Sequence, residues 1–599
     1  MKCGVLAGQF KLGRRPAAIG RNASSLLLNH FDICRFVLSK ELRSKSFEFK
    51  PSEWAVIFTV PIRAKVSREE STMIRRIEML AVAILMAIPL HAAVYQYKAP
   101  VGTRTAYLWV PPQARHVRGI VFAMENMLER NWLEDPIVRQ ACAREKLGIV
   151  WLSAGDASDH LITWEMSPAS AHAIEQMFVD LAKVSGFVEI EYVPLILTGH
   201  SFNGRMWLLT RRIPDRVIAV APIRSYPLPG SLGFDGIPML YIVGQTTELP
   251  EFNDGKPGDR DFYLPRLQMS ALALRQSSDE NLLGVAVEAG GTHTDWSQNQ
   301  ARLLAMFLED ACKYRLPRDA PHSGPVQLRP VAPQSGWLAD ATGMEPERYR
   351  PAPYAKYRGD PKQAYWFFDG AIARAAMALA GDRKPRELQM PTFVDAGKPL
   401  PVEMDGYVHP PLHLEDDGVT FNVSGGFLPV IPAGLVGAGK PLGHGTPAFT
   451  FRVIMGPVMQ VGPHTFRVQF DRQQPRDIMI EVEQPADGRY RHAVQPAKIH
   501  FPPVLREGKP QKITFPAITD RKRGVPAVRL NATSDSGLPV SYYVDAGPAE
   551  VSGDLLRITQ IPARSVPPIE ITVVAYQWGR MGTDAVQSAV SVKRSFLLR

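Results

Sequence analysis

Cysteine is scarce in this sequence of 599 residues, which contains only four. Cys3 and Cys34 lie near the N-terminus, and only Cys142 and Cys312 lie beyond residue 93. Small secreted domains that depend on disulfides are much denser in cysteine, so a disulfide scaffold is excluded. Neither a C-x-x-C nor an H-E-x-x-H spacing occurs. The sequence therefore predicts no metal site, and no cofactor is expected.

An excess of charge of one sign is also lacking over most of the chain. The net charge is +10, but residues 1–72 contribute +7 and residues 73–93 one more, which leaves +2 for residues 94–599. A basic surface that binds nucleic acid is therefore not indicated. With 45% hydrophobic and 21% charged residues the composition is globular, and the length predicts several domains.

Long hydrophobic runs are absent as well. The most apolar segment, Met79–Leu90, has 12 residues, fewer than the ~20 that a membrane-spanning helix needs. Residues 73–93, MIRRIEMLAVAILMAIPLHAA, instead have the basic start, apolar centre and small final residues of a signal peptide. We predict a periplasmic or extracellular protein with no stable membrane span after cleavage. We also expect Met73 to be the true start, with residues 1–72 a non-native upstream extension or a disordered leader.

Residues 94–316 alternate between short apolar runs and amphipathic stretches, which is typical of a sheet covered by helices on both faces. The predicted fold class is therefore α/β with a mostly parallel sheet. Strands are expected at residues 106–110, 119–124, 148–153, 193–198, 216–222, 238–243 and 284–288. Helices are expected at residues 136–145, 167–185, 202–212, 261–276 and 297–314.

The pattern changes beyond residue 316. Residues 317–390 contain a Pro-rich linker and a helical segment expected at residues 364–379. In residues 391–505, alternation of period two, as in AFTFRVIM and DIMIEVE, predicts a β-sandwich domain. Residues 506–599 contain KITFPAITD, ATSDSGLPV and GPAEVSG. They resemble the immunoglobulin-like repeats of exported bacterial proteins, which implies a second small sandwich without catalytic residues.

The stretch LILTGHSFNG, residues 195–204, leads from an apolar run through Ser201 into a helical segment. A serine at a sharp strand-to-helix turn is the arrangement of a nucleophile elbow, in which the helix N-terminus faces the reacting group. The pattern G-x-S-x-G has a small residue two positions after the serine, whereas this sequence has Asn203 there and Gly204 one later. We predict Ser201 as the nucleophile and Asn203 as the departure from the pattern.

A nucleophilic serine needs a histidine to accept its proton and an acid to orient that histidine. His293, in EAGGTHTDW, lies between the apolar run LGVAV and a helix, and is the predicted base. The acid should follow the strand at residues 238–243, because the elbow fold has the order serine, acid, histidine. Glu248 is the first choice there, and the open alternatives are Glu251, Asp254 and Asp261.

The oxyanion of a tetrahedral intermediate needs preorganised N–H donors. The backbone N–H of Phe202 is predicted as one of them. The second is expected in the loop AMENMLERNW, with Glu125 as the first choice and Met124 or Asn126 as alternatives. Asn126 would also be able to donate its side-chain amide.

With Ser201 and His293 in this order, residues 94–316 resemble the α/β-hydrolase superfamily. No long cap domain is expected between the sixth and seventh strands. In this respect the sequence resembles the compact esterases of the superfamily, which include carbohydrate esterases, feruloyl esterases and polyhydroxybutyrate depolymerases. The resemblance implies a serine hydrolase that cleaves carboxylic or carbohydrate esters through an acyl-enzyme, with an ester such as an acylated polysaccharide as substrate. The alternatives are a serine peptidase of the same fold and a catalytically inactive exported binding or adhesion protein.

The resemblance implies two further features. It places Cys142 and Cys312 on helices that pack on the same face of the sheet, where an exported protein would be able to join them in a disulfide. It also brings several aromatic side chains near the site, where they would line a pocket or pack in the core. These aromatic residues are Trp151, Trp164, Phe202, Trp207 and Trp296.

Overall fold

The structure is a computed structural model, which describes residues 95–599 apart from 157–160, 163–165, 226–235, 248–262, 319–322, 474–475 and 526. The predicted leader and signal peptide, residues 1–93, lie outside the described residues. Residues Leu90–Arg599 cluster as one compact unit. In the part of the chain that the structure describes, no helix has the length and apolar character that crossing a membrane requires.

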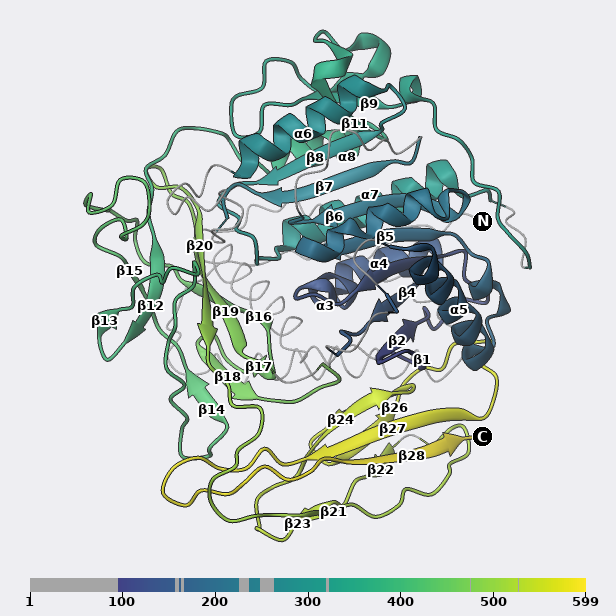
Figure 1. Cartoon of the computed structure of the whole chain (residues 1–599), viewed down its shortest axis with the longest axis vertical. Coiled ribbons are helices and arrows are strands. Elements are labelled where there is room, and N and C mark those ends of the chain that lie inside the picture. Colours follow the sequence, from purple (N-terminus) through teal and green to yellow (C-terminus); the bar gives the residue numbers. More distant parts are fainter. Residues whose placement is uncertain are drawn as a thin grey trace, which may run out of the picture. The chain divides into compact units, whose positions relative to one another are not determined.

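An eight-stranded sheet is formed by β1 (Tyr97–Val101), β2 (Arg104–Trp109), β3 (Gly119–Met124), β4 (Leu147–Leu152), β5 (Leu195–His200), β6 (Val217–Ile223), β7 (Met239–Gly244) and β8 (Leu283–Glu288). Its strand order is β1-β2-β4-β3-β5-β6-β7-β8 (Figure 1). β2 pairs antiparallel with both β1 and β4, and the other pairs are parallel. From β3 to β8 every strand residue is buried, as a sheet covered on both faces requires.

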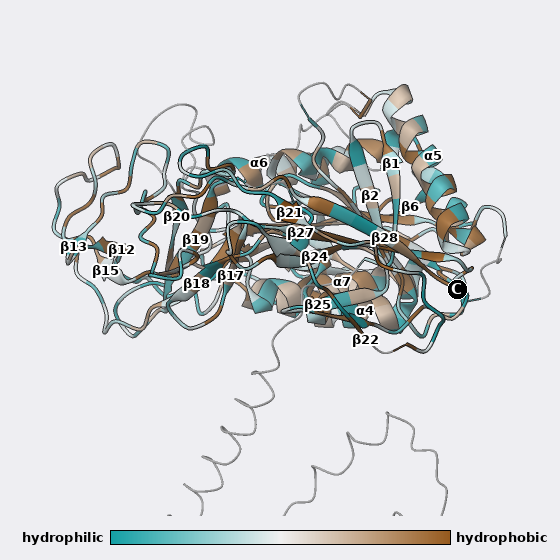
Figure 2. Ribbon diagram, turned by 90° about the horizontal axis from the view of Figure 1, so that it is seen from below, coloured by the Kyte–Doolittle hydropathy of each residue, from teal (hydrophilic) through white to brown (hydrophobic). Residues whose placement is uncertain are grey.

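Helices cover both faces of this sheet, with α4 and α7 on one side and α5 and α6 on the other (Figure 2). They are α3 (Glu129–Leu133), α4 (Pro136–Glu145), α5 (Pro168–Ser185), α6 (Tyr263–Ser277) and α7 (Gln298–Arg315), with the 3₁₀ helix η3 (Ser201–Arg211). Asp135, Ser167 and Ser297 cap α4, α5 and α7, each accepting a first-turn backbone N–H. The α/β class with a mostly parallel sheet is confirmed, and the helix expected at residues 202–212 is the 3₁₀ helix.

The two cysteines lie on α4 and α7, which pack against each other. Both side chains are completely buried, and both are free thiols. Burial raises the pKa of the Cys142 thiol to about 12. The placement of Cys142 and Cys312 on neighbouring helices is therefore confirmed, whereas the disulfide is not formed in this structure.

Residues after the large sheet form β9 (Trp337–Asp340), β10 (Ala352–Pro353), β11 (Ala364–Phe367) and α8 (Gly370–Ala378). The prediction of a helix over residues 364–379 is wrong at its start, because the buried residues AYWF pair as β11 with β9. The aromatic rings favour a buried, pleated strand. The helix begins only after Asp369, whose carboxylate accepts N–H bonds from Ala371 and Ile372.

From residue 391 onward the chain is all-β and forms small antiparallel sheets, consistent with β-sandwich domains. The immunoglobulin-like character of residues 506–599 stays a prediction. A separate hydrophobic core joins strands of the first of these domains. The strands are β12 (Pro391–Asp395), β13 (Lys398–Pro399), β14 (Thr420–Asn422), β15 (Gly425–Phe427), β16 (Thr450–Met455), β17 (Val458–Gln460), β18 (Thr465–Val468), β19 (Ile478–Gln484), β20 (Ala493–Ile499), β21 (Ile513–Thr514), β22 (Ala527–Arg529), β23 (Thr533–Ser534), β24 (Ser541–Ala546), β25 (Ala549–Ser552), β26 (Leu555–Ile558), β27 (Ile569–Tyr576) and β28 (Val592–Leu598).

Candidate active site

Ser201 lies at a sharp turn between β5 and η3. Its φ angle is 51°, a left-handed conformation that is strained for any residue except glycine. The turn is so tight that a Cβ on Gly199 would overlap the backbone carbonyl of Asn203. A Cβ on Gly204 would overlap the side chain of Ser225, which follows β6. Gly204, and not the residue before it, is therefore the small residue that faces the neighbouring strand.

His293 lies in the loop after β8, and its Nε2 is 2.8 Å from the Oγ of Ser201. Both side chains are buried, with Ser201 8% and His293 3% exposed. Burial lowers the pKa of His293 well below its usual value, and nearby His200 and Arg224 lower it further. A neutral imidazole at this distance is able to accept the proton of the serine hydroxyl.

Asn203 ties the elbow to the loop after β3. Its side-chain Nδ2 donates to the carbonyl of Met124 at 3.0 Å and to the carbonyl of Glu125 at 2.9 Å. The departure from the elbow pattern thus has a structural role, because the Asn203 amide joins the turn at Ser201 to the end of β3.

Glu129, at the start of α3, holds the same loop from the other side. Its fully buried carboxylate accepts N–H bonds from Asn126 at 2.8 Å, Met127 at 3.0 Å and His200 at 2.8 Å. Burial and the neighbouring carboxylate of Glu125 raise the pKa of Glu129 to about 8, although the N–H bonds act against this shift. The Glu129 side chain therefore joins the loop after β3 to His200, the residue before Ser201. No sequence pattern predicted this role.

The oxyanion donors predicted in this loop need correction. The backbone N–H of Glu125 donates to the carbonyl of Leu152 at 2.7 Å, as part of the sheet edge, so it does not point at Ser201. The backbone N–H of Asn126 is bound by Glu129. The Asn126 side-chain amide also has acceptors in this structure: it donates to the carbonyl of His200 at 3.3 Å, and its Nδ2 lies 3.5 Å from His200 Nδ1. His200 is the residue directly before Ser201. Phe202 lies in the first turn of η3 and is 39% exposed.

His200 is a buried neighbour of His293. Its Nε2 is 2.9 Å from the backbone carbonyl of His293, and the two rings lie 4.8 Å apart. A carbonyl only accepts, so Nε2 carries the proton and Nδ1 is left as an acceptor toward Asn126. Burial lowers the pKa of His200 to about 4, which keeps the ring neutral.

A buried ion pair supports the loop that carries His293. The guanidinium of Arg224 contacts Asp295 at 2.8 Å and Glu288 at 3.0 Å, and the three side chains are at most 8% exposed. Asp295 also accepts the backbone N–H of Thr292 at 2.8 Å. The network therefore fixes the backbone on both sides of His293.

The remaining sequence predictions have mixed outcomes. Glu248 lies outside the described residues, as do its alternatives Glu251, Asp254 and Asp261, so the triad acid stays a prediction. Trp164 lies outside them as well. Trp207 and Trp296 are buried in the core, and Trp151 is buried with its Nε1 bound to Glu125 at 2.8 Å.

Residues of the β-rich part contact both loops of the site. Gln473 donates to the carboxylate of Glu125, and Arg476 lies 3.7 Å from the same group. On the other side, His492 Nδ1 is 2.8 Å from the carbonyl of Ala289, in the loop that leads to His293. The alternation of period two in residues 391–505 does not predict these contacts, because they join residues far apart in sequence.

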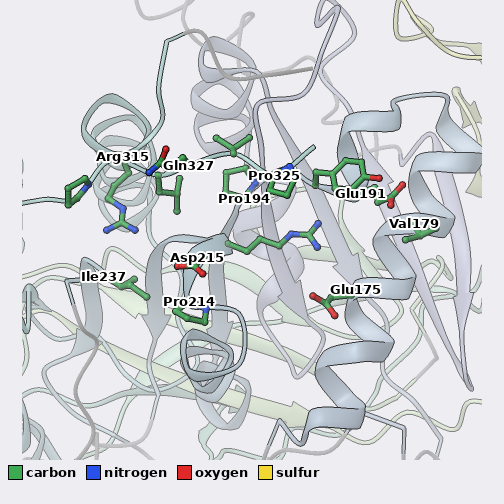
Figure 3. Close-up of a pocket in the computed structure, with 15 residues that line it drawn as sticks. Glu175, Val179, Glu191, Pro194, Pro214, Asp215, Ile237, Arg315, Pro325 and Gln327 are labelled. Carbon is green, nitrogen blue, oxygen red and sulfur yellow. The ribbon is translucent and has the colours of Figure 1, made fainter. Parts of the chain in front are cut away.

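Two large cavities lie at opposite ends of the strands of the sheet. One, of about 830 Å³, is lined by residues that precede strands, among them Pro194 and Ile237 (Figure 3). The other, of about 790 Å³, is lined by residues that follow β3 and β4, among them Glu125 and Ser153. Among the residues discussed for the site, the second cavity is lined by Glu125 and Trp151, and its lining includes neither Ser201 nor His293.

No protein-family model and no curated protein matches the chain. Solved structures similar to it include a CIB-like hydrolase from Thermoplasma acidophilum, at 12% identity and a TM-score of 0.26, over 36% of this chain and 99% of that one. Est1E from Butyrivibrio proteoclasticus is similar at 13% identity and a TM-score of 0.25, over 36% and 97%. Dienelactone hydrolase from Anabaena variabilis is similar at 13% identity and a TM-score of 0.26, over 37% and 96%.

At such low identities and TM-scores we assign the fold from the chain's own geometry. An antiparallel β2 is followed by parallel strands in the order β4-β3-β5-β6-β7-β8. A strained serine follows β5, and a histidine follows β8. These features define an α/β-hydrolase fold.

Proposed function

We propose that this protein is an exported serine esterase in which Ser201 is the nucleophile and His293 the general base. The contact of 2.8 Å between Ser201 Oγ and His293 Nε2 supports the proposal, since nucleophilic catalysis by serine needs a base within hydrogen-bond reach of the hydroxyl. Export rests on the signal-like residues 73–93. Glu248 is proposed as the acid that orients the histidine.

The proposed reaction runs in two halves. His293 accepts the hydroxyl proton while Ser201 Oγ attacks the ester carbonyl carbon, and the tetrahedral oxyanion forms. The proposed donors to this oxyanion are the Phe202 N–H and the side-chain amide of Asn126, which would leave its acceptors on His200 to bind it. The histidine then protonates the leaving alcohol, and a water molecule, activated by the same histidine, releases the acid from the acyl-enzyme.

A fluorophosphonate probe tests the nucleophile directly. We expect labelling of the purified protein at Ser201, shown by peptide mass spectrometry, and hydrolysis of p-nitrophenyl acetate. Ser201→Ala should lose both, whereas Ser335→Ala, at an exposed serine remote from the site, should retain both. Protein that is folded but neither labelled nor active would contradict the proposal in favour of an inactive binding protein. Cleavage of a dipeptide amide in preference to the ester would favour a peptidase.

N-terminal sequencing of the protein recovered from a bacterial periplasm tests export. We expect a mature start near residue 94, since Ala92 and Ala93 provide the small residues of a cleavage site. A product that retains Phe47–Arg63 would contradict both the signal peptide and the proposed start at Met73.

A further inference from the structure

His200 contacts every other part of the candidate site through its polar groups. It is the last residue of β5, directly precedes Ser201 and is completely buried. Its backbone N–H donates to the carboxylate of Glu129 at 2.8 Å, and its ring Nε2 lies 2.9 Å from the backbone carbonyl oxygen of His293. Its ring Nδ1 and its own carbonyl oxygen lie 3.5 and 3.3 Å from the side-chain Nδ2 of Asn126. One residue thus joins the turn at the nucleophile to the loop of the base and to the loop after β3.

These contacts require one tautomer of the His200 ring. A carbonyl oxygen only accepts, so Nε2 carries the proton and donates to His293. Nδ1 then keeps its lone pair, which faces the amide nitrogen of Asn126, a donor. The ring therefore donates toward the base loop and accepts from the loop after β3.

Thr198, two residues earlier in the same strand, shows what a purely structural contact looks like here. It is 1% exposed, and its Oγ1 donates to the backbone carbonyl of Ala221 in the neighbouring strand β6 at 2.8 Å. That bond joins two strands of the sheet and does not reach the site. The contacts of His200 instead end on residues that carry or support the proposed chemistry.

The His200 ring is also held neutral. Burial and the nearby cation of Arg224 lower its pKa to about 4, although the hydrogen bond to the carbonyl of His293 acts in the opposite direction. The carboxylate of Glu129 binds the backbone N–H of His200. The rings of His200 and His293 lie 4.8 Å apart, so a charge on the first would oppose the imidazolium that forms on the second. A proton on Nδ1 would also turn the acceptor that faces Asn126 into a donor.

We infer that His200 is a positioning residue for the proposed esterase reaction. Its Nε2–H fixes the backbone of His293, while its Nδ1 and carbonyl oxygen hold the resting amide of Asn126 beside Ser201. His293 Nε2 has to stay within hydrogen-bond reach of Ser201 Oγ, and a displacement of about 1 Å costs about 100-fold in rate. The two contacts of Asn126 are long, so its amide leaves them for the oxyanion at a small cost. This inference rests on the proposed function.

Three substitutions of His200 separate its two side-chain contacts. His200→Leu removes both, His200→Gln places an amide donor near the position of Nε2, and His200→Asn places an amide oxygen near the position of Nδ1. We expect His200→Leu to lower kcat on p-nitrophenyl acetate and the rate of fluorophosphonate labelling about 10- to 100-fold, with KM changed less than about threefold. His200→Gln should recover most of the labelling rate, whereas His200→Asn should not.

Thr198→Val is the matched control, because it removes a buried hydrogen bond of the same strand that does not reach the site. It should lower the free energy of unfolding but leave kcat and KM unchanged. Urea denaturation establishes which variants are folded. Should His200→Leu fail to fold, the difference between His200→Gln and His200→Asn tests the same contacts.

Hydrogen–deuterium exchange, read by mass spectrometry, tests the positioning without any activity. Amide exchange in residues 289–296 should be faster in His200→Leu than in the wild-type protein and unchanged in Thr198→Val. That result would show that His200 holds this loop even if the wild-type protein neither labelled nor cleaved an ester, an outcome that would refute the proposed function alone. Wild-type exchange, labelling and kcat in His200→Leu would overturn the inference. So would a loss in His200→Gln equal to that in His200→Leu, or an equal loss of kcat in Thr198→Val.

Discussion

Replacing Asn203 with leucine tests whether the elbow and the loop after β3 are held together by one amide. Leucine has nearly the same size and shape, but it removes both hydrogen bonds to the carbonyls of Met124 and Glu125, at 3.0 and 2.9 Å. Both of these residues are about 4% exposed, so water replaces the lost donors poorly. A hydrogen bond contributes about 0.5–1.5 kcal/mol, and a buried polar group left without a partner costs about 1–3 kcal/mol.

We therefore expect Asn203→Leu to lower the free energy of unfolding by about 2–3 kcal/mol, measured by urea denaturation. The released loop carries Asn126, a proposed oxyanion donor, so kcat on p-nitrophenyl acetate should fall about 10- to 100-fold. Asn203→Asp should be at least as harmful, because its carboxylate would face two carbonyl oxygens. Asn299→Asp, at an exposed asparagine in the first turn of α7, is the matched control and should be neutral.

Wild-type kcat and wild-type stability in Asn203→Leu would refute this reasoning. A loss of stability with full activity would refute only the link between the loop and the oxyanion. The rate of fluorophosphonate labelling gives an independent readout of the site, since it requires the serine and its base but no ester leaving group.

Three further predictions concern the groups around the base. Arg224→Met leaves the buried carboxylates of Asp295 and Glu288 without their cation. The free energy of unfolding should therefore fall by about 3–5 kcal/mol at pH 7. The loss should shrink in urea titrations at lower pH, because burial raises the pKa of Glu288 and its protonation removes one of the uncompensated charges. Because burial lowers the pKa of His293, the acid limb of kcat/KM should lie well below pH 6.5, and a midpoint at or above 6.5 would contradict a buried, neutral base. Burial alone would lower the pKa of His492, but its hydrogen bonds to Glu483 and to the carbonyl of Ala289 outweigh burial and raise that pKa. The stabilisation from this shift is fully present below the pKa of His492 in the unfolded chain, and it is lost as the pH rises through the pKa in the folded chain. His492→Gln should therefore destabilise the protein more at pH 6 than at pH 9. Urea denaturation curves of both proteins at the two pH values measure this difference.

Much of the hydrolase domain could be predicted from local pattern. Buried parallel strands are continuous apolar runs, and all seven predicted strands lie within two residues of their observed positions. The helix at residues 136–145 was predicted with its observed bounds, since Asp135 and Pro136 mark its start. Residues 364–367 were misassigned because a short run of buried aromatics has no period that separates a strand from a helix.

The residues of the candidate site also fall into those that local sequence predicts and those that only the structure reveals. Ser201 and His293 could be found because each needs a specific local context, a turn and a loop that follow a strand. The sequence did not predict the roles of Glu129, Asn203 and Arg224. The partners of these polar side chains lie far away in sequence and become neighbours only in the folded chain. Glu125 was predicted as a donor through its N–H, but pairing with β4 occupies that group.

By itself the sequence predicted most strands and helices of residues 106–316 and the candidate pair Ser201 and His293, because these depend on residues close together in the chain. Tertiary structure decided which backbone N–H groups near Ser201 are already bound, which buried carboxylates face Arg224, and that the β-rich part contacts the loops of Glu125 and Ala289. Such properties depend on distances between residues up to about 350 positions apart, as between Glu125 and Gln473. The stretch LILTGHSFNG predicts Ser201 as the nucleophile, but only the folded chain shows that Asn203 donates to the carbonyls of Met124 and Glu125.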